Sequence, residues 1–149
     1  LLYNDGSIYN ISDFKNKTLP DKTINNINVQ GKKVYLSTSF GVVVIDLENL
    51  EFENTYNTGD NTYCTYLFGN KLYTGNKSGI LCCDTTKNML DRNNWELVYK
   101  KYPINSICSL NGKLYCQISN LGIYTFDIDK NTLKLVIANN GEKYKSIYK

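Results

Sequence analysis

Histidine is absent from this 149-residue chain, and methionine, tryptophan and proline are scarce. Without histidine the chain cannot form a Ser-His-Asp or Cys-His catalytic group, and zinc sites that use histidine are excluded. Thirteen tyrosines, with many asparagines and threonines, favour strands and polar turns over packed helices. The composition therefore predicts an all-β fold.

Long apolar runs are also missing. No stretch approaches the roughly 18 residues of a membrane span, and Leu1-Leu2-Tyr3 lacks the charged region and cleavage site of a signal peptide. We therefore expect the chain to open in the middle of a structure. The net charge of +3 comes from scattered lysines, which argues against nucleic acid and leaves an acidic glycan or lipid head group as a conceivable partner.

The five cysteines form no C-x-x-C pair, and all of them fall inside predicted strands. They are Cys64, Cys82, Cys83, Cys108 and Cys116. We interpret them as small buried apolar side chains. A disulfide stays open as an alternative, and the odd number leaves at least one thiol unpaired.

A pattern of about forty residues occurs three times along the chain. Each copy has an apolar strand, a turn with Gly, a strand with Tyr, a second Gly and an apolar run that ends in Asp. The tyrosines Tyr35, Tyr73 and Tyr115 are 38 and 42 residues apart. A period of this length with four short strands per unit is typical of a β-propeller blade.

Each copy also carries a fourth apolar stretch, at residues 50–52, 95–99 and 133–137. The third stretch of each copy is apolar on both faces, as a strand must be when its blade lies between two others. The sequence thus predicts a partial propeller of about three four-stranded antiparallel blades.

The expected blades are residues 24–59, 62–101 and 104–138, all within one domain spanning 1–149. Residues 1–11 are expected to be the end of a preceding blade and residues 144–149 the start of a following one. The intervening segment 12–23 is interpreted as a long link between blades.

The repeated acidic residues are interpreted as turn formers rather than as catalysts. Asp46, Asp84 and Asp127 each close a third strand, where a short carboxylate can accept backbone N–H groups. Together with Glu51 and Glu53 they show no arrangement typical of a glycosidase pair. We assign no catalytic, cofactor-binding or metal residue to this chain, and we expect a protein that is not an enzyme.

Five tyrosines could line a carbohydrate platform if they were exposed, although core packing is the favoured interpretation. They are Tyr3, Tyr9, Tyr56, Tyr63 and Tyr99.

Residues 21–27, 34–47 and 55–56 carry a specific pattern, with Asp-Lys-Thr-Ile-Asn-Asn-Ile preceding Tyr-Leu-Ser-Thr-Ser-Phe-Gly and an apolar run. This pattern resembles the N-terminal β-propeller family of PorZ, a component of the type IX secretion system of Bacteroidetes. The resemblance is concentrated in residues 1–59, and no ligand-binding residue of the family can be carried over.

The resemblance implies a non-catalytic assembly role at the cell surface or outer membrane, with PorU-, PorV- and PorQ-like partners and anionic lipopolysaccharide. Similar propellers also serve as periplasmic glycan sensors of hybrid two-component regulators, and that alternative stays open. An enzyme that gathers acidic residues at a central channel is the third, least favoured hypothesis.

Overall fold

Twelve strands in three antiparallel sheets make up the described part of this computed structural model, which comprises residues 6, 21 and 23–141. The first sheet contains β1 (Ile24–Gln30), β2 (Lys33–Thr38), β3 (Gly41–Asp46) and β4 (Glu51–Asn57). The second contains β5 (Thr62–Phe68), β6 (Lys71–Asn76), β7 (Gly79–Asp84) and β8 (Glu96–Tyr99). The third contains β9 (Ser106–Leu110), β10 (Lys113–Ile118), β11 (Gly122–Asp127) and β12 (Thr132–Ala138).

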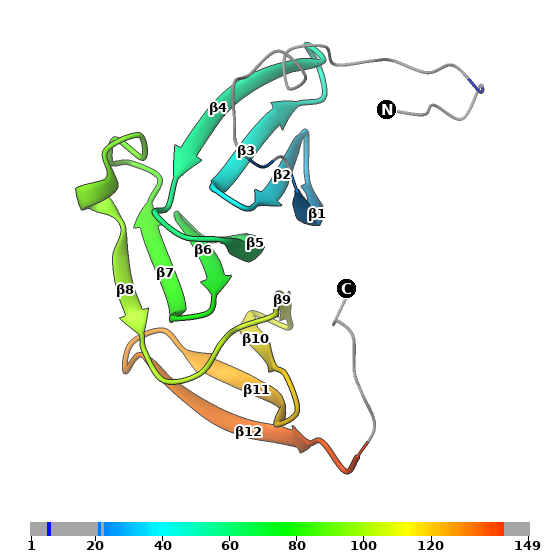
Figure 1. The fold of residues 1–149 in the computed structure, drawn as a ribbon, viewed down its shortest axis with the longest axis vertical. Helices are drawn as coiled ribbons and strands as arrows, with labels where there is room; N and C mark the ends of the chain where they lie inside the picture. Colours follow the sequence, from blue (N-terminus) through cyan, green and yellow to red (C-terminus); the bar gives the residue numbers. More distant parts are fainter. Residues whose placement is uncertain (1–5, 7–20, 22, 142–149) are drawn as a thin grey trace.

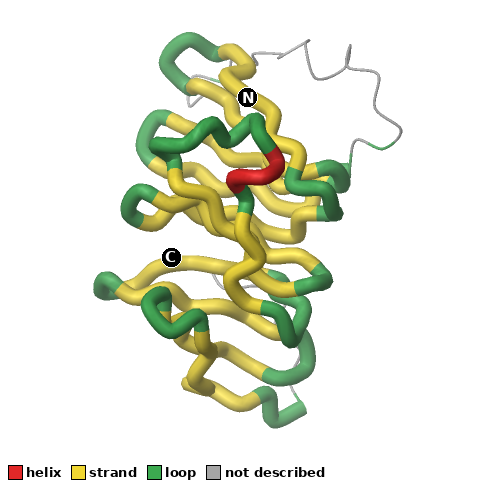
Figure 2. The backbone as a smooth tube through the Cα atoms, turned by 90° about the vertical axis from the view of Figure 1, so that its left-hand side faces the viewer, coloured by secondary structure: helices red, strands yellow, loops and turns green. Residues whose placement is uncertain are grey.

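The sheets follow one another round an arc (Figure 1). Strands pair in sequence order within each sheet, so that β1, β5 and β9 lie on the inside of the arc and β4, β8 and β12 on the outside. Seen from the side, the sheets are stacked face to face (Figure 2). This arrangement confirms the predicted fold class of three four-stranded propeller blades. The segments expected to belong to flanking blades, 1–11 and 144–149, lie outside the described residues apart from Gly6, as does most of the expected link.

Alternate residues of β7, the third strand of the middle sheet, face different neighbouring sheets, which explains why this strand carries the apolar run at residues 80–83. Val42 and Val44 of β3 pack with Leu81 and Cys83 of β7 between the first and second sheets. Ile80 and Cys82 of β7 enter the core between the second and third sheets instead. The middle blade is therefore buried on both faces, as the sequence pattern predicted.

The cysteines contribute to these cores as apolar side chains. None of the five forms a disulfide, and each lies within a strand. Cys64 and Cys116 are fully enclosed between the second and third sheets, where burial raises the pKa of the Cys64 thiol to about 12. The burial of Cys64, Cys82, Cys83 and Cys116 agrees with the packing interpretation, whereas Cys108 is half-buried and lies outside these cores.

Two of the predicted fourth strands begin at the wrong residue. Leu50 precedes β4 and has a positive φ of 56°, because it belongs to the turn that reverses the chain. Trp95 precedes β8 and caps a short 3-10 helix, η1 (Arg92–Asn94). Apolar character led to both errors, since an apolar turn residue and a strand residue look alike in sequence.

Trp95 packs at the outer side of the interface between the first two sheets, which we term the first seam. Its indole N–H donates to the Met89 carbonyl oxygen at 2.9 Å, and its ring lies 6.3 Å from that of Tyr56 on β4. The loop from β7 to β8 is long enough to place Met89 and Trp95 there, whereas the corresponding connections of the other sheets are short turns.

Candidate functional site

Each carboxylate that follows a third strand of the repeat sits in a turn of its own. Asp46 Oδ1 accepts the N–H groups of Glu48 and Asn49 at 2.7 and 3.1 Å. Asp84 Oδ1 accepts the N–H and the hydroxyl of Thr86 at 2.9 and 2.7 Å. These hydrogen bonds lower the pKa of both carboxyl groups because they stabilise the charged form.

Asp127 repeats the arrangement, accepting the N–H groups of Asp129 and Lys130 at 3.1 and 3.0 Å. The three aspartates lie at the ends of three different blades, so the structure does not bring them together. Among the residues described, no cluster of three or more Cys, Asp or Glu could hold a metal ion. The carboxylates of the repeat therefore stabilise turns, as the sequence predicted.

The tyrosines considered for a carbohydrate platform are used mainly in packing. Tyr56 packs against the core between the first two sheets, and Tyr99 stands edge-on to Phe126 with ring centres 6.5 Å apart. Tyr63 is half-buried at a β-bulge in β5. Tyr3 and Tyr9 lie outside the described residues.

Asn76 illustrates how a sequence motif can mislead. Asn76-Lys77-Ser78 fits an N-glycosylation sequon, yet the Asn76 side chain is buried and its Oδ1 accepts the N–H groups of Ser78 and Gly79 at 2.8 and 3.0 Å. Its amide shapes the turn between β6 and β7 and is not presented to solvent.

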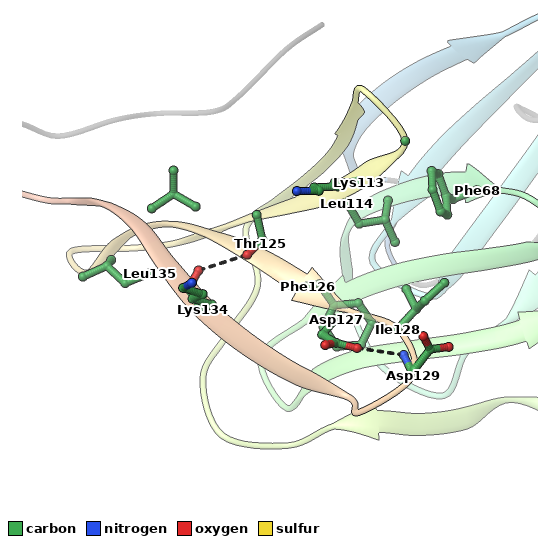
Figure 3. A pocket seen from close by; sticks show the side chains of 12 residues that line it. Phe68, Lys113, Leu114, Thr125, Phe126, Asp127, Ile128, Asp129, Lys134 and Leu135 are labelled. Carbon is green, nitrogen blue, oxygen red and sulfur yellow. Dashed lines mark hydrogen bonds between the residues drawn. The ribbon is translucent and has the colours of Figure 1, made fainter.

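A pocket with a volume of about 530 Å³, which we term the larger pocket, opens on the third sheet (Figure 3). Its lining comes from β10, β11, β12 and the turn after β11, with Phe68 of the second sheet at one end. Thr125, which lines this pocket, occupies the same position in the third blade as Cys82 does in the second blade. Each of the two residues stands opposite the tyrosine of the second strand in its own sheet. Cys82 is covered by the third sheet. This pocket therefore lies partly on a face shaped for blade packing.

The smaller pocket, of about 230 Å³, lies beside the seam between the first and second sheets. It is bounded by the link from β4 to β5, the turn from β6 to β7 and the segment from η1 to β8. The lining residues are Gly59, Asp60, Asn76, Ser78, Leu81, Arg92, Trp95 and Leu97. Sequence reasoning missed it, because its residues come from three separated segments and carry no motif.

Polar side chains also fix the inner side of this seam. Gln30 on β1 donates through Nε2 to the Leu67 carbonyl at 2.8 Å, and the Leu67 N–H donates to Gln30 Oε1 at 2.7 Å. Asn28 donates to the Thr65 carbonyl at 2.7 Å, and Asn25 to that of Thr62 at 2.7 Å. These amides, which we term the amide ladder, occupy backbone groups on the free edge of β5.

Fold and repeat together define a β-propeller protein, and comparison with known proteins gives its family. The family model described as the N-terminal β-propeller domain of PorZ of the type IX secretion system matches residues 1–96. Because the match covers more than half of the chain, this chain belongs to that family, as its sequence resemblance indicated. A search of curated protein sequences found no match.

Several solved structures share the fold. PorZ of Porphyromonas gingivalis has a TM-score of 0.76 at 20% identity, over 92% of this chain and 19% of its own. The extracellular domain of BT3049, a putative hybrid two-component system of B. thetaiotaomicron, has a TM-score of 0.57 at 20% identity, over 96% of this chain and 19% of its own. The WD40 repeats of RRP9 have a TM-score of 0.60 at 12% identity, over 82% of this chain and 40% of theirs. This chain thus spans about a fifth of the first two structures.

Proposed function

We propose that this chain is a non-catalytic interaction propeller of a type IX secretion component, working outside the cytoplasm at the cell surface or outer membrane. The family match over residues 1–96 is the observation that carries the proposal. Its partners would be PorU-, PorV- and PorQ-like proteins, and its role would be to support the processing of secreted cargo and its attachment to anionic lipopolysaccharide.

The described residues fit a binding role better than catalysis. The aspartates of the repeat are engaged in turns, and the buried thiols have raised pKa values. No helix among the described residues is long and apolar enough to cross a membrane. We also propose residues 24–59, 62–101 and 104–138 as the limits of the blades.

Affinity purification of the full-length parent protein from detergent-treated outer membranes tests this function. Recovery of a sortase-like protein with outer-membrane barrels, identified by mass spectrometry and lacking in the untagged strain, would support the proposal. Recovery of the parent protein without any such partner would contradict it.

A second function is a glycan-sensing propeller, supported by the likeness to the extracellular domain of the BT3049 system. Here the parent protein would fractionate with the inner membrane and carry a kinase. Separating the inner from the outer membrane and locating the parent protein by immunoblot distinguishes the two proposals, because they place it in different membranes.

A further inference from the structure

The smaller pocket is lined from two sides, and both sides are made of residues that the structure describes. The link between β4 and β5 supplies Gly59 and Asp60, while the second sheet supplies Asn76, Ser78 and the segment from Arg92 to Leu97. By contrast, the larger pocket takes most of its lining from one sheet. The smaller pocket is therefore the better candidate for a built binding site.

Arg92 is the only arginine among 17 basic side chains, and it lies in this pocket. Its guanidinium group lies directly over Gly59, because a Cβ atom at Gly59 would come within 2.6 Å of Nε and 2.9 Å of a terminal nitrogen. Gly59 has a φ of 77°, and its N–H donates to Asn57 Oδ1 at 2.8 Å. The turn thus leaves space for the guanidinium where any other residue would place a side chain.

The charge balance of the pocket leaves this guanidinium without a carboxylate partner. Asp60 lines the same pocket but pairs with Lys77, whose Nζ lies 3.4 Å from Oδ1. Asp60 Oδ1 also accepts the N–H of Asn61 at 2.8 Å. No ion pair found in the described part of the chain includes Arg92. The lining itself carries one cation and one anion, Arg92 and Asp60, and this anion is already paired with Lys77, which lies outside the lining.

The chemistry of the lining selects one kind of ligand group. A guanidinium presents a planar set of N–H donors that matches the oxygens of a carboxylate or phosphate. Leu81, Trp95 and Leu97 add an apolar wall beside it. A volume of about 230 Å³ is small for a complete oligosaccharide and is suited to one charged group with part of the ring that carries it.

We propose that the Arg92 pocket binds a single oxyanion, a phosphate or carboxylate group carried by a sugar. The choice of a sugar as carrier rests on the proposed function, whereas the oxyanion chemistry rests on the pocket itself. The guanidinium of Arg92 would donate hydrogen bonds to the oxyanion. Gly59, which has no side chain, leaves the space that this guanidinium occupies.

Isothermal titration calorimetry on the full-length parent protein at low salt tests this site. The probes are glucose 6-phosphate, glucuronate and uncharged glucose. We expect at least one of the two anions to bind in the millimolar range and more tightly than glucose, and the preference between them identifies the group. Arg92→Gln is expected to weaken that binding about tenfold or more, and Arg92→Lys is expected to weaken it less.

Two further variants separate ligand binding from folding. Lys87→Gln removes an exposed cation from the same loop and should leave affinity within about twofold. Gly59→Asn keeps Arg92 but displaces its guanidinium, and asparagine accepts a left-handed backbone, so affinity should fall while the thermal midpoint stays near that of the unmodified protein. Equal affinity of Arg92→Gln and the unmodified protein, or binding of neither anion, would overturn the proposal. Partner recovery by Arg92→Gln reports on the secretion role separately.

Discussion

Glycine at the start of each third strand is required by contact as well as by conformation. Gly79 has a φ of 139°, and a Cβ atom there would lie 1.8 Å from the Tyr99 carbonyl oxygen on β8. Gly41 and Gly122 are similarly opposed by the carbonyl oxygens of Tyr56 and Ile137 at 2.1 and 2.0 Å. A side chain would therefore push the fourth strand away from the third in every blade.

We predict that Gly79→Ala destabilises the protein by about 3 kcal/mol or more. Gly112→Asn is the matched control, because Gly112 has a φ of 71° in a hairpin turn and nothing lies within 4 Å of its Cβ position. Asparagine tolerates that conformation, so the control should cost less than about 1 kcal/mol. Urea unfolding measures both, and equal losses would contradict the steric argument.

The turn aspartates predict how stability depends on acid. Hydrogen bonds hold the pKa of Asp84 and Asp46 below the ordinary value of 3.8 in the folded chain. Their stabilising effect is therefore complete above the unfolded value and is lost as the pH falls through the folded one. The thermal midpoint should decline below about pH 4, and Asp46→Asn/Asp84→Asn should reduce that decline.

Carboxyl NMR titration checks the cause directly. A midpoint for Asp84 at or above 3.8 in the folded protein would contradict the effect of the turn hydrogen bonds. An unchanged acid dependence in the double variant would show that other carboxylates dominate.

At the scale of elements, the amide ladder gives the interface between the first and second sheets a different set of contacts from the interface between the second and third sheets. Between the second and third sheets the register counterparts of Asn28 and Gln30 are Tyr66 and Phe68 on β5, and Tyr66 forms a hydroxyl contact of 2.9 Å with Ser109. Between the first and second sheets, Gln30 instead binds both backbone groups of Leu67. The first seam thus has directional hydrogen bonds where the second relies more on apolar packing.

We predict that Gln30→Met, which keeps the size but removes both hydrogen bonds, lowers the free energy of unfolding by about 1–2 kcal/mol. Lys87→Met, in the exposed loop before η1, is the control and should change it by less than about 0.5 kcal/mol. Chemical denaturation compares the two. A loss for Gln30→Met no larger than that of the control would show that the ladder contributes no net stability.

At the scale of the whole molecule, the outer sheets carry apolar side chains at positions that are covered in the middle one. Ile27 and Val29 on β1 are 60% and 58% exposed, whereas their register counterparts Thr65 and Leu67 on β5 contact the first sheet. Leu110 on the third sheet is also exposed. Such faces favour association with another surface.

We predict that this 149-residue chain, prepared by itself, self-associates in a concentration-dependent way, and that Ile27→Thr/Val29→Thr reduces the association. Leu90→Thr is the control, since Leu90 is equally exposed but lies in a loop rather than on a sheet face. Sedimentation velocity measures the effect. An equal reduction by the loop variant would show that general hydrophobicity, and not the sheet face, drives association.

The repeat could be predicted from the sequence because the residues that indicate it lie close together in the chain. A hairpin needs glycine or asparagine within a few residues of its strands, and a doubly buried strand needs consecutive apolar residues. Val42 to Ile45 therefore indicated a sandwiched strand without any knowledge of its neighbours, and Asp84 indicated a turn. Leu50 and Trp95 were assigned to strands because local apolar character does not distinguish an apolar turn residue from a strand residue.

The sequence by itself determined the blade repeat, the all-β class, the family and the structural use of the aspartates and cysteines, because these depend on short-range patterns. Only the tertiary structure decided which residues meet across a seam. Gln30 meets Leu67, and Arg92 lies over Gly59, through the stacking of successive sheets. Such contacts depend on the distance and angle between blades, which no spacing along the chain records.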